Sequence, residues 1–535
     1  MTAGQNPNGT ANGRNGQNPF PTYDVAIVGG GITGLSAAWN LQRLARDNGR
    51  PLSYTLLESG DRWGGKIKTE TIEGFGDEPF VIEGGPDSFI TSKPWAWQLT
   101  KQLELVPEAL PTNDDRRQTF VLQRGKPVPL PDGVMMIVPT RFTPFALSPL
   151  ISPLGKLRMG LDLLIPRRKD GRDETLADFI RRRLGDEALD KIAEPLMSGI
   201  YNAEAEKQSV LATFPRFRDI EARYGSLIRG MLAAKRARAS APDSQSAEAD
   251  KPASIFVSYR AGMNTLVDSL LGELDGDLRL NTAVTGMTMA LDGYYELLTS
   301  GGMLRARAVI LAVPAYAAAA ILHAIAPDAA EALRQIRYVS TGTISLGFRR
   351  DEIDHPLNGF GIVIPRSERR PINAITWSST KFDHRAPGNA ALLRVFFGGS
   401  RSPEMMDKPD EELRAIVKQE LAKIMGIHAE PIVERIYRWR RANPQYDVHH
   451  LERVAAIEAA LPAGLLVAGS PYRGIGIPDC VHQGQQASDQ VYSYLGEAER
   501  AGQTSANSAA ALLGSDKEQA MANAGPEKLA SQSHV

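Results

Sequence analysis

The chain has 535 residues, of which 42% are apolar and 23% are charged, a composition typical of a folded globular body. Its 61 basic and 62 acidic side chains leave a net charge of −1, so no basic surplus indicates nucleic-acid binding. Cys480 is the single cysteine, which excludes an intrachain disulfide and any site built from several cysteines, and fits a reducing cytoplasm. No uninterrupted apolar run predicts a membrane span.

In chain order, the first pattern is a βαβ opening. Residues 23–28 form an apolar run, a glycine cluster follows, and helical spacing starts at Leu35. The predicted strands are 23–28, 53–58, 254–258, 278–285, 294–299, 305–313, 343–348, 391–397 and 463–468. The predicted helices are 175–184, 186–197, 410–426 and 481–495, and the first two belong to a middle segment, 86–240, that is mostly helical. This alternation predicts an α/β fold with a parallel sheet.

The same patterns predict three domains, two tails and a loop. A Rossmann-like nucleotide domain is assembled from 21–90, 254–320 and 455–495, and is interrupted by a helical domain, 91–234, and a mixed α+β substrate domain, 321–454. Residues 1–20 lack the apolar stretch of a signal peptide and predict a disordered tail. Residues 496–535 predict a second tail, and 235–253 a mobile loop.

A G-x-G-x-x-G motif, Gly29, Gly31 and Gly34, follows the first strand and opens the first helix. These glycines permit a tight turn, a close approach to a pyrophosphate, and close packing of helix on strand. Glu58 ends the next strand, where a ribose hydroxyl needs an acceptor. A turn without a ligand is the alternative, but strand, helix and acid together favour a dinucleotide site.

The charge of Glu58 limits which dinucleotides could bind at this site. A carboxylate at Glu58 would repel a 2′-phosphate, which leaves NAD and FAD. The second glycine pair, Gly64 and Gly65, and the glycine loop at 466–489 leading into a helix favour FAD.

At these motifs the sequence resembles the FAD-dependent protoporphyrinogen/coproporphyrinogen III oxidases of haem synthesis, over about residues 23–495. Glycine loops are shared with many amine oxidases, whereas SGIY with the ATFP stretch, and RW with NPQY, are narrower. One departure is Val448-His449-His450, where the family more often has Val-Gly-His. The stretches that match are DVAIVGGGITGLSAAW (24–39), RWGGKIKT (62–69), IEGGPDSF (82–89), LPDGVMMIVPTRFTPFALSPLISPLGKLRM (130–159), EPLMSGIYNAEAEKQSVLATFP (194–215), SYRAGMNTLVDSL (258–270), KFDHRAP (381–387), LLRVFFGG (392–399), RWRRANPQY (438–446) and GIGIPDCVHQGQQA (474–487).

The resemblance implies FAD as cofactor and a set of residues that contact it. Val284 would meet the adenine through its backbone, and Trp439 would lie near the isoalloxazine, with core packing as the alternative for this tryptophan. The implied FAD contacts are Gly29, Gly30, Gly31, Ile32, Thr33, Gly34, Glu58, Ser59, Lys66, Gly85, Pro86, Asp87, Ser88, Val284, Trp439, Ile475, Gly476 and Ile477.

A porphyrinogen is a flexible apolar macrocycle that carries propionates, so it needs an apolar pocket with cations at the rim. The resemblance implies oxidation in successive two-electron rounds, with oxygen as acceptor and hydrogen peroxide as product. Lys93 falls where bacterial relatives carry a basic residue beside the pocket, with a solvated surface lysine as the alternative. Ile200, Tyr201 and Asn202 are expected to line the pocket, with core packing as the alternative. No metal or catalytic side chain is needed.

Three other features have mainly structural interpretations. Cys480 is expected to be a small buried apolar group. His449 and His450, as neighbours, would point apart on a strand and bind no metal. The stretch 134–165 combines apolar side chains with Arg141, Lys156 and Arg158, so it is compatible with peripheral membrane contact, although packing in the substrate domain is favoured.

Alternatives remain at this stage. Within the family, the substrate is coproporphyrinogen III or protoporphyrinogen IX, and the soluble bacterial type favours the former. An amine oxidase or carotenoid desaturase would keep the fold but change the substrate, and a non-enzymatic binding protein would lack tight flavin binding. We expect a cytoplasmic enzyme whose surface is compatible with peripheral membrane contact, and a transfer partner such as a ferrochelatase.

Overall fold

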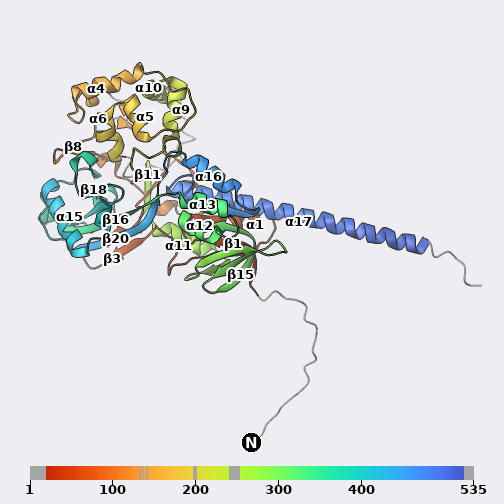
Figure 1. The fold of residues 1–535 in the computed structure, drawn as a ribbon. Helices are drawn as coiled ribbons and strands as arrows, with labels where there is room; N and C mark the ends of the chain where they lie inside the picture. The colour runs from red at the N-terminus through yellow and green to blue at the C-terminus, as the bar shows by residue number, and fades with distance from the viewer. Residues whose placement is uncertain are drawn as a thin grey trace, which may run out of the picture.

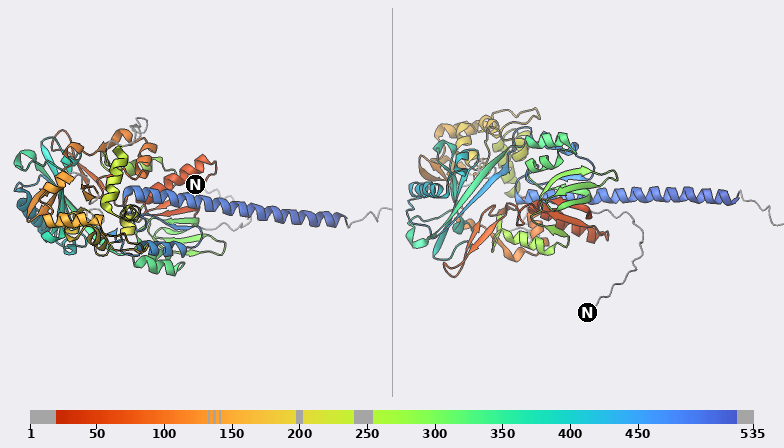
Figure 2. Two further views of the ribbon diagram at one scale, coloured as in Figure 1. Left: turned by 90° about the horizontal axis from the view of Figure 1, so that it is seen from above. Right: turned by 60° about the horizontal axis from the view of Figure 1, so that its bottom comes forward.

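The computed structural model describes residues 20–131, 134–135, 138–139, 142–196, 202–239 and 254–522. Two β-sheets and a helical lobe form the body, and a long C-terminal helix projects from it (Figures 1 and 2). Apart from Phe20, the tail predicted at residues 1–20 lies outside the described residues. Among those residues, none of the helices combines the length and apolarity that a bilayer span requires.

The first sheet has seven strands in the order β12-β2-β1-β15-β14-β13, with β21 also paired to β15. Its central strands run parallel, and β13 and β14 form an antiparallel extension. The strands are β1 (Thr22–Val28), β2 (Tyr54–Leu57), β12 (Asp277–Arg279), β13 (Val284–Met289), β14 (Tyr295–Thr299), β15 (Gly302–Leu311) and β21 (Leu465–Val467).

Helices cover both faces of this sheet because successive side chains of a strand point to opposite sides. Val25 and Ile27 of β1 join the apolar cluster formed with α1, α11 and α17. Ala26 and Val28 join the cluster formed with α12, α13 and α16. The helices are α1 (Ile32–Asp47), α11 (Asn264–Glu273), α12 (Ala315–Leu322), α13 (Pro327–Arg334), α16 (His450–Ala459) and α17 (Ile477–Ala522). The predicted α/β fold class is confirmed.

The second sheet has the order β20-β16-β19-β18-β17-β7-β8. Its neighbours are antiparallel except β17 and β7. Helix α15 (Asp410–Met425) packs its apolar side chains on the sheet. The strands are β7 (Thr119–Gln123), β8 (Lys126–Pro129), β16 (Tyr338–Arg349), β17 (Gly361–Val363), β18 (Ile372–Trp377), β19 (Ala390–Gly398) and β20 (Val433–Pro444), with the short helix α14 (Ser378–Lys381) between β18 and β19.

The helical lobe encloses its own apolar core. Inside it, Arg183 is fully buried and donates through Nε to Asp162 at 2.5 Å. The helices are α3 (Phe142–Leu147), α4 (Pro153–Gly160), α5 (Leu176–Arg183), α6 (Asp186–Ala188), α8 (Val210–Thr213), α9 (Pro215–Tyr224) and α10 (Leu227–Ala239).

Shorter elements connect these parts. They are the hairpin β3 (Thr69–Ile72) with β4 (Phe80–Glu83), the three-stranded sheet β5 (Phe89–Ile90), β11 (Phe256–Tyr259) and β6 (Ala109–Pro111), the pair β9 (Val134–Met135) and β10 (Val138–Pro139), and α2 (Trp95–Gln102).

Several predicted boundaries differ from the structure. The predicted strand 278–285 is interrupted, because Asn281 adopts a left-handed backbone (φ 51°), and it becomes β12 and the start of β13. Residues 186–197 are not one α-helix, since α6 is followed by a π-helical turn, Leu189–Ala193. Strands β7 and β8 join the second sheet although 91–234 was expected to form a helical domain.

The termini of two helices also differ. Helix α17 starts at Ile477 and continues past Leu495, where the second tail was expected, because the alanine-rich sequence beyond it favours helix. Helix α10 continues to Ala239, so it occupies the start of the loop predicted at 235–253. Residues 240–253 of that loop lie outside the described residues.

Candidate functional site

The G-x-G-x-x-G motif forms the turn between β1 and α1. Gly29 has a left-handed φ of 109°, and a Cβ on Gly34 would lie 1.9 Å from the Gly29 carbonyl oxygen, so both positions require glycine. Gly31 precedes α1 without any side-chain cap. A Cβ at Gly31 would meet no atom closer than 3.9 Å. The uncapped first turn of the helix therefore borders open space and can receive a phosphate.

Glu58 lies just after β2 and contacts the same turn. Its Oε2 accepts a hydrogen bond from Gly30 N at 2.8 Å, and its Oε1 accepts from Gly60 N at 2.7 Å and from Ser59 Oγ at 3.1 Å. Ile32 and Thr33 form the first turn of α1 beside it and are buried. The expected proximity of acid and glycine turn is present, and the contact with a ribose stays a prediction.

A second loop, residues 61–66, packs on the glycine turn. Gly64 N donates to Gly30 O at 2.8 Å, and Arg62 donates to the carbonyls of Trp63 and Ile67. Lys66 Nζ lies 3.3 Å from Ser470 Oγ, and burial lowers the pKa of Lys66. Within the described part of the chain, no carboxylate forms an ion pair with this ammonium, so it fits a site that receives an acidic group of a cofactor.

A third loop, residues 469–476, leads into α17. Tyr446 Oη donates to Ser470 O at 2.7 Å and accepts from Gly474 N at 2.8 Å. Gly474 has φ 125°, and a Cβ there would meet Asp479 at 2.4 Å. The predicted flavin contacts Ile475, Gly476 and Ile477 follow this braced turn at the start of α17.

His449 and His450 belong to the start of α16, not to a strand. His449 has φ 71° and precedes the helix, whose first residue is the buried His450. The His450 ring stacks on Tyr446, and Nε2 donates to Tyr472 O at 2.8 Å. Burial lowers the pKa of His450 to about 4, so the ring is neutral near pH 7. No cluster of three metal-ligating side chains exists among the described residues.

The fourth candidate segment runs from Gly84 to Ser88. Trp439 Nε1 donates to Gly84 O at 2.7 Å, and a Cβ on Gly85 would lie 1.7 Å from Lys66 O. Asp87 pairs with Lys381 at 2.8 Å and accepts from Ser88 Oγ at 2.8 Å. Pro86 lies between these contacts. The segment thus joins the first sheet's loops to the second sheet.

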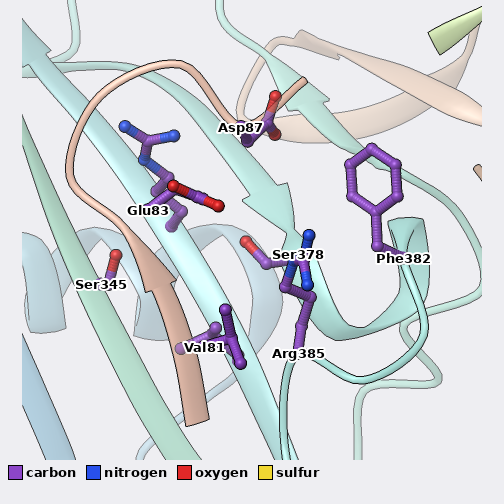
Figure 3. Close-up of a pocket in the computed structure, with 9 residues that line it drawn as sticks. Val81, Glu83, Asp87, Ser345, Ser378, Phe382 and Arg385 are labelled. Carbon is purple, nitrogen blue, oxygen red and sulfur yellow. The ribbon is translucent and has the colours of Figure 1, made fainter. Parts of the chain in front are cut away.

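A small cavity lined by both charged and apolar side chains lies next to this segment (Figure 3). Burial raises the pKa of Glu83 to about 7, although Met263 N donates to it. Burial alone would raise the pKa of Asp87 too, but the charges of Lys381 and Arg394 outweigh it and hold that pKa well below its usual range. The lining residues are Val81, Glu83, Asp87, Ser345, Ser378, Phe382, Arg385, Leu392 and Arg394.

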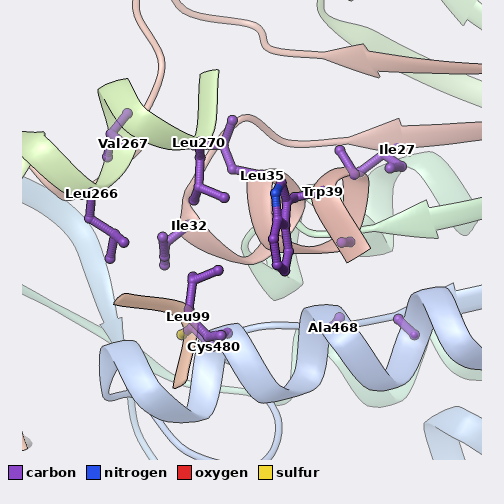
Figure 4. Close-up of a cluster of buried hydrophobic side chains, with 14 of the residues drawn as sticks. Ile27, Ile32, Leu35, Trp39, Leu99, Leu266, Val267, Leu270, Ala468 and Cys480 are labelled. Carbon is purple, nitrogen blue, oxygen red and sulfur yellow. The ribbon is translucent and has the colours of Figure 1, made fainter. Parts of the chain in front are cut away.

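Two further residues that the sequence analysis considered are Val284, on a strand, and Cys480, on a helix. Val284 starts β13 opposite Thr299 and is partly buried against the first sheet's core. Cys480 lies on α17 among the apolar side chains that α1, α2 and α11 contribute (Figure 4). Burial raises the pKa of its thiol to about 11, so Cys480 is the inert apolar group expected from the sequence.

The structure describes only two of the four residues predicted to bind the substrate, Lys93 and Asn202. Ile200 and Tyr201 lie outside the described residues. Asn202 has a left-handed backbone (φ 49°), and its Oδ1 lies 3.1 Å from where a Cβ on Gly399 would stand. Lys93 forms an ion pair with Asp479 on α17, since its Nζ lies 2.7 Å from both carboxylate oxygens.

Sequence reasoning missed Tyr446, Asp479 and Arg394. All three lie in stretches that carry the family resemblance, but their roles depend on contacts between distant segments. Arg394, for example, donates to Gly85 O at 2.6 Å across 309 residues of sequence.

A family model for flavin-containing amine oxidoreductases matches residues 32–492. The chain belongs to that family. It is 36% identical over 479 residues to a coproporphyrinogen III oxidase of Bacillus subtilis, covering 88% of this chain and 98% of the relative. It is 35% identical over 513 residues to a coproporphyrinogen III oxidase of Propionibacterium freudenreichii, covering 91% and 94%.

A solved structure supports the same assignment. It is that of a protein from Exiguobacterium sp. 255-15, described provisionally as a protoporphyrinogen oxidase, which has a TM-score of 0.74 and 32% identity and covers 88% of this chain and 98% of its own. The predicted family resemblance is confirmed, the protein is an oxidoreductase, and family membership agrees with the flavin, FAD, expected from the sequence. The glycine turn, the first turn of α1 and Lys66, for which the described residues offer no ion-pair partner, fit such a cofactor.

Proposed function

We propose that the protein is an FAD-dependent oxidase that converts coproporphyrinogen III to coproporphyrin III in haem biosynthesis, with oxygen as acceptor and hydrogen peroxide as product. The observation that carries the proposal is near-full-length similarity to two bacterial coproporphyrinogen III oxidases, together with four loops that converge around the α1 and α17 N-termini. Bound FAD would accept hydride from a ring carbon and pass the electrons to oxygen.

In this proposal each loop has a role toward FAD. The first turn of α1 faces the pyrophosphate, Glu58 the ribose, and Val284 the adenine. Lys66, Trp439, residues 85–88 and residues 475–477 would face the flavin. What the chain contributes is placement, because the uncapped helix and the braced turns hold backbone groups in position before the cofactor binds.

Lys93 and the residues from Ile200 to Asn202 are proposed to bind the substrate. Lys93 lies beside the start of α17, which carries the proposed flavin contacts, so a propionate near the flavin would be within the reach of its ammonium. The charge is shared with Asp479, which would hold the ammonium at the start of α17.

Protoporphyrinogen IX is the alternative substrate. The chain is also 31% identical over 497 residues to a chloroplastic protoporphyrinogen oxidase of Nicotiana tabacum, but the two bacterial relatives above are more similar. Coproporphyrinogen III and protoporphyrinogen IX should be oxidised separately while porphyrin fluorescence and hydrogen peroxide are followed. Faster turnover of coproporphyrinogen III is expected. Activity on protoporphyrinogen IX alone, or on amines alone, would overturn the proposal.

We further propose a cytoplasmic enzyme with peripheral membrane contact through α4 and the turn after it. Leu154, Leu157, Leu161 and Leu164 recur at helical spacing and are exposed, Leu154 by 78%. The core interpretation of 134–165 holds for Phe145 and Leu150, which are buried. The expected basic rim is used internally, since Lys156 and Arg158 donate to backbone carbonyls.

Sedimentation with anionic vesicles tests this contact. The wild-type protein should sediment, and a variant with Leu154→Ser and Leu157→Ser should not. A ferrochelatase, which would accept the porphyrin product, is the proposed protein partner. Binding of the wild type and of the same double variant is also measured with ferrochelatase in place of vesicles. The comparison shows whether these leucines contact a lipid surface or a protein surface.

A further inference from the structure

We propose that Arg394 is a positioning residue that fixes the Gly84–Ser88 segment, and through it the flavin, from the second sheet. The inference rests on the proposed function, because the contact between this segment and FAD is part of that proposal. Arg394 lies on β19, the strand between β16 and β18, where both neighbours hold it in register. Its side chain leaves the sheet toward the loops of the nucleotide domain.

The contacts of Arg394 converge on the backbone of this segment. Its Nη2 donates to Gly85 O at 2.6 Å and to Gly84 O at 3.3 Å. Trp439, on β20 of the same sheet, donates to the same Gly84 carbonyl. Gly84 and Gly85 therefore present their carbonyls to side chains of the second sheet.

Charge adds to this arrangement. Arg394 is 5% exposed, and the attraction between its guanidinium and Asp87 contributes to the low pKa of that carboxyl. Lys381, which precedes β19 at the end of α14, pairs with Asp87 directly. The segment is thus held at Gly84, Gly85 and Asp87 by side chains of the second sheet and its connecting helix.

Free movement of the segment is prevented on its other side as well. A Cβ on Gly85 would collide with Lys66 O, so the segment lies directly on the loop that carries Lys66. A shift at Gly85 would displace Lys66, which is itself a proposed flavin contact. Loss of the Arg394 contacts should therefore change the flavin environment and not only the stability of the fold.

Arg385 provides a matched control. It lines the same cavity (Figure 3) and is 2% exposed. It also donates to the backbone carbonyls of Tyr259 and Arg260 and to Ser258 Oγ. Its hydrogen bonds end on β11 and the turn after it, although its charge also acts on Glu83 and Asp87. Replacing either arginine therefore removes a buried cation from one cavity, but of the two only Arg394 donates hydrogen bonds to the backbone of the Gly84–Ser88 segment.

The test compares Arg394→Met and Arg394→Lys with Arg385→Met in purified full-length protein. FAD dissociation constants are measured by reconstitution without porphyrinogen, together with the visible absorption spectrum of the bound flavin and the melting temperature. Arg394→Met should weaken FAD binding roughly tenfold or more, since the Gly85 carbonyl loses its arginine donor and the Gly84 carbonyl keeps only that of Trp439, and should shift the flavin bands. Arg394→Lys should restore part of both, because one donor and the charge remain.

Arg385→Met should lower the melting temperature while FAD affinity and spectrum stay close to the wild type. The inference is overturned if Arg394→Met binds FAD with wild-type affinity and spectrum, or if Arg385→Met changes both equally. Should Arg394→Met not fold, Arg394→Lys decides alone, and a wild-type flavin spectrum and affinity in it overturns the inference. A wild-type protein that binds FAD but oxidises neither porphyrinogen would instead overturn the proposed function and leave this comparison valid.

Discussion

Lys93 Nζ lies 2.7 Å from both carboxylate oxygens of Asp479, and this pair connects the segment before α2 with the first turn of α17. The lysine side chain is 45% exposed, whereas the aspartate is 11% exposed. An ion pair of this exposure adds little to stability. The ion pair matters for the proposed function because Asp479 fixes the position of the Lys93 ammonium, which a substrate propionate would also attract.

Replacing Lys93 with Ala should raise KM for coproporphyrinogen III more than it lowers kcat, because the contact is similar in ground and transition states. Since the lysine is partly exposed, the loss should be about 1 kcal/mol, or a roughly fivefold rise in KM. Steady-state kinetics at low and high salt provide the measurement. Lys126→Ala, at an exposed position of β8, removes the same charge elsewhere. An unchanged KM at low salt would leave Lys93 as a partner of Asp479 only.

Replacing Glu58 with Gln should weaken FAD binding by about 1–2 kcal/mol, because a charge-assisted contact becomes neutral. The structure adds a second reason. Glu58 accepts from both Gly30 N and Gly60 N, and an amide offers only one acceptor oxygen. FAD titration of the apoprotein measures the loss. Glu73→Gln, which removes an exposed carboxylate after β3, should bind FAD as the wild type does, and wild-type affinity in Glu58→Gln would contradict the assignment.

The part of the site that is proposed to bind the nucleotide could be predicted, because the residues that indicate it lie close together in the sequence. The glycine turn, Glu58 and α1 follow one another within one βαβ unit, and each residue type is dictated by its own backbone or charge. The partners of the other half are distant in sequence. Nothing near Arg394 indicates Gly85, and nothing near Lys93 indicates Asp479, since the pairing depends on how two sheets and α17 pack. Likewise, the strand predicted at 278–285 is interrupted at Asn281, because the left-handed backbone of this residue is a local exception within a β-type pattern.

Glu83 predicts a pH dependence of stability. Its pKa in the folded protein is about 7, above its ordinary value of 4.5, because the carboxyl is buried. Between these two values the folded protein keeps a proton that the unfolded chain releases, so the free energy of unfolding falls as pH rises. Glu83→Gln carries no such cost, and should be more stable than the wild type by about 1–3 kcal/mol at pH 8 and by less at pH 5.

Melting temperatures of the FAD-loaded proteins from pH 5 to pH 8 measure this difference. The control is Glu73→Gln, which removes an exposed carboxylate from the turn after β3 and should leave the pH dependence of the wild type unchanged. A stability difference between Glu83→Gln and the wild type that does not grow with pH would show that Glu83 is ionised in the folded protein across this range.

The last prediction concerns the end of α17. Leu495 is fully buried, and four residues later Glu499 Oε1 lies 2.9 Å from Arg307 Nη1 of β15 and Glu499 Oε2 lies 4.0 Å from Arg50 Nε. Beyond this point the helix projects away from the body in every view (Figures 1 and 2). A chain that ends at Arg500 keeps these contacts and should retain wild-type melting temperature and activity.

A chain that ends at Gly496 loses Glu499, and because all three side chains are partly exposed the cost should be no more than about 1 kcal/mol. Glu499→Gln in the full-length chain should reproduce that small loss, which separates the ion pairs from the removal of backbone. If the chain ending at Arg500 melted well below the wild type, residues after 500 would have to stabilise the body, and the projecting helix would need a docking surface of its own.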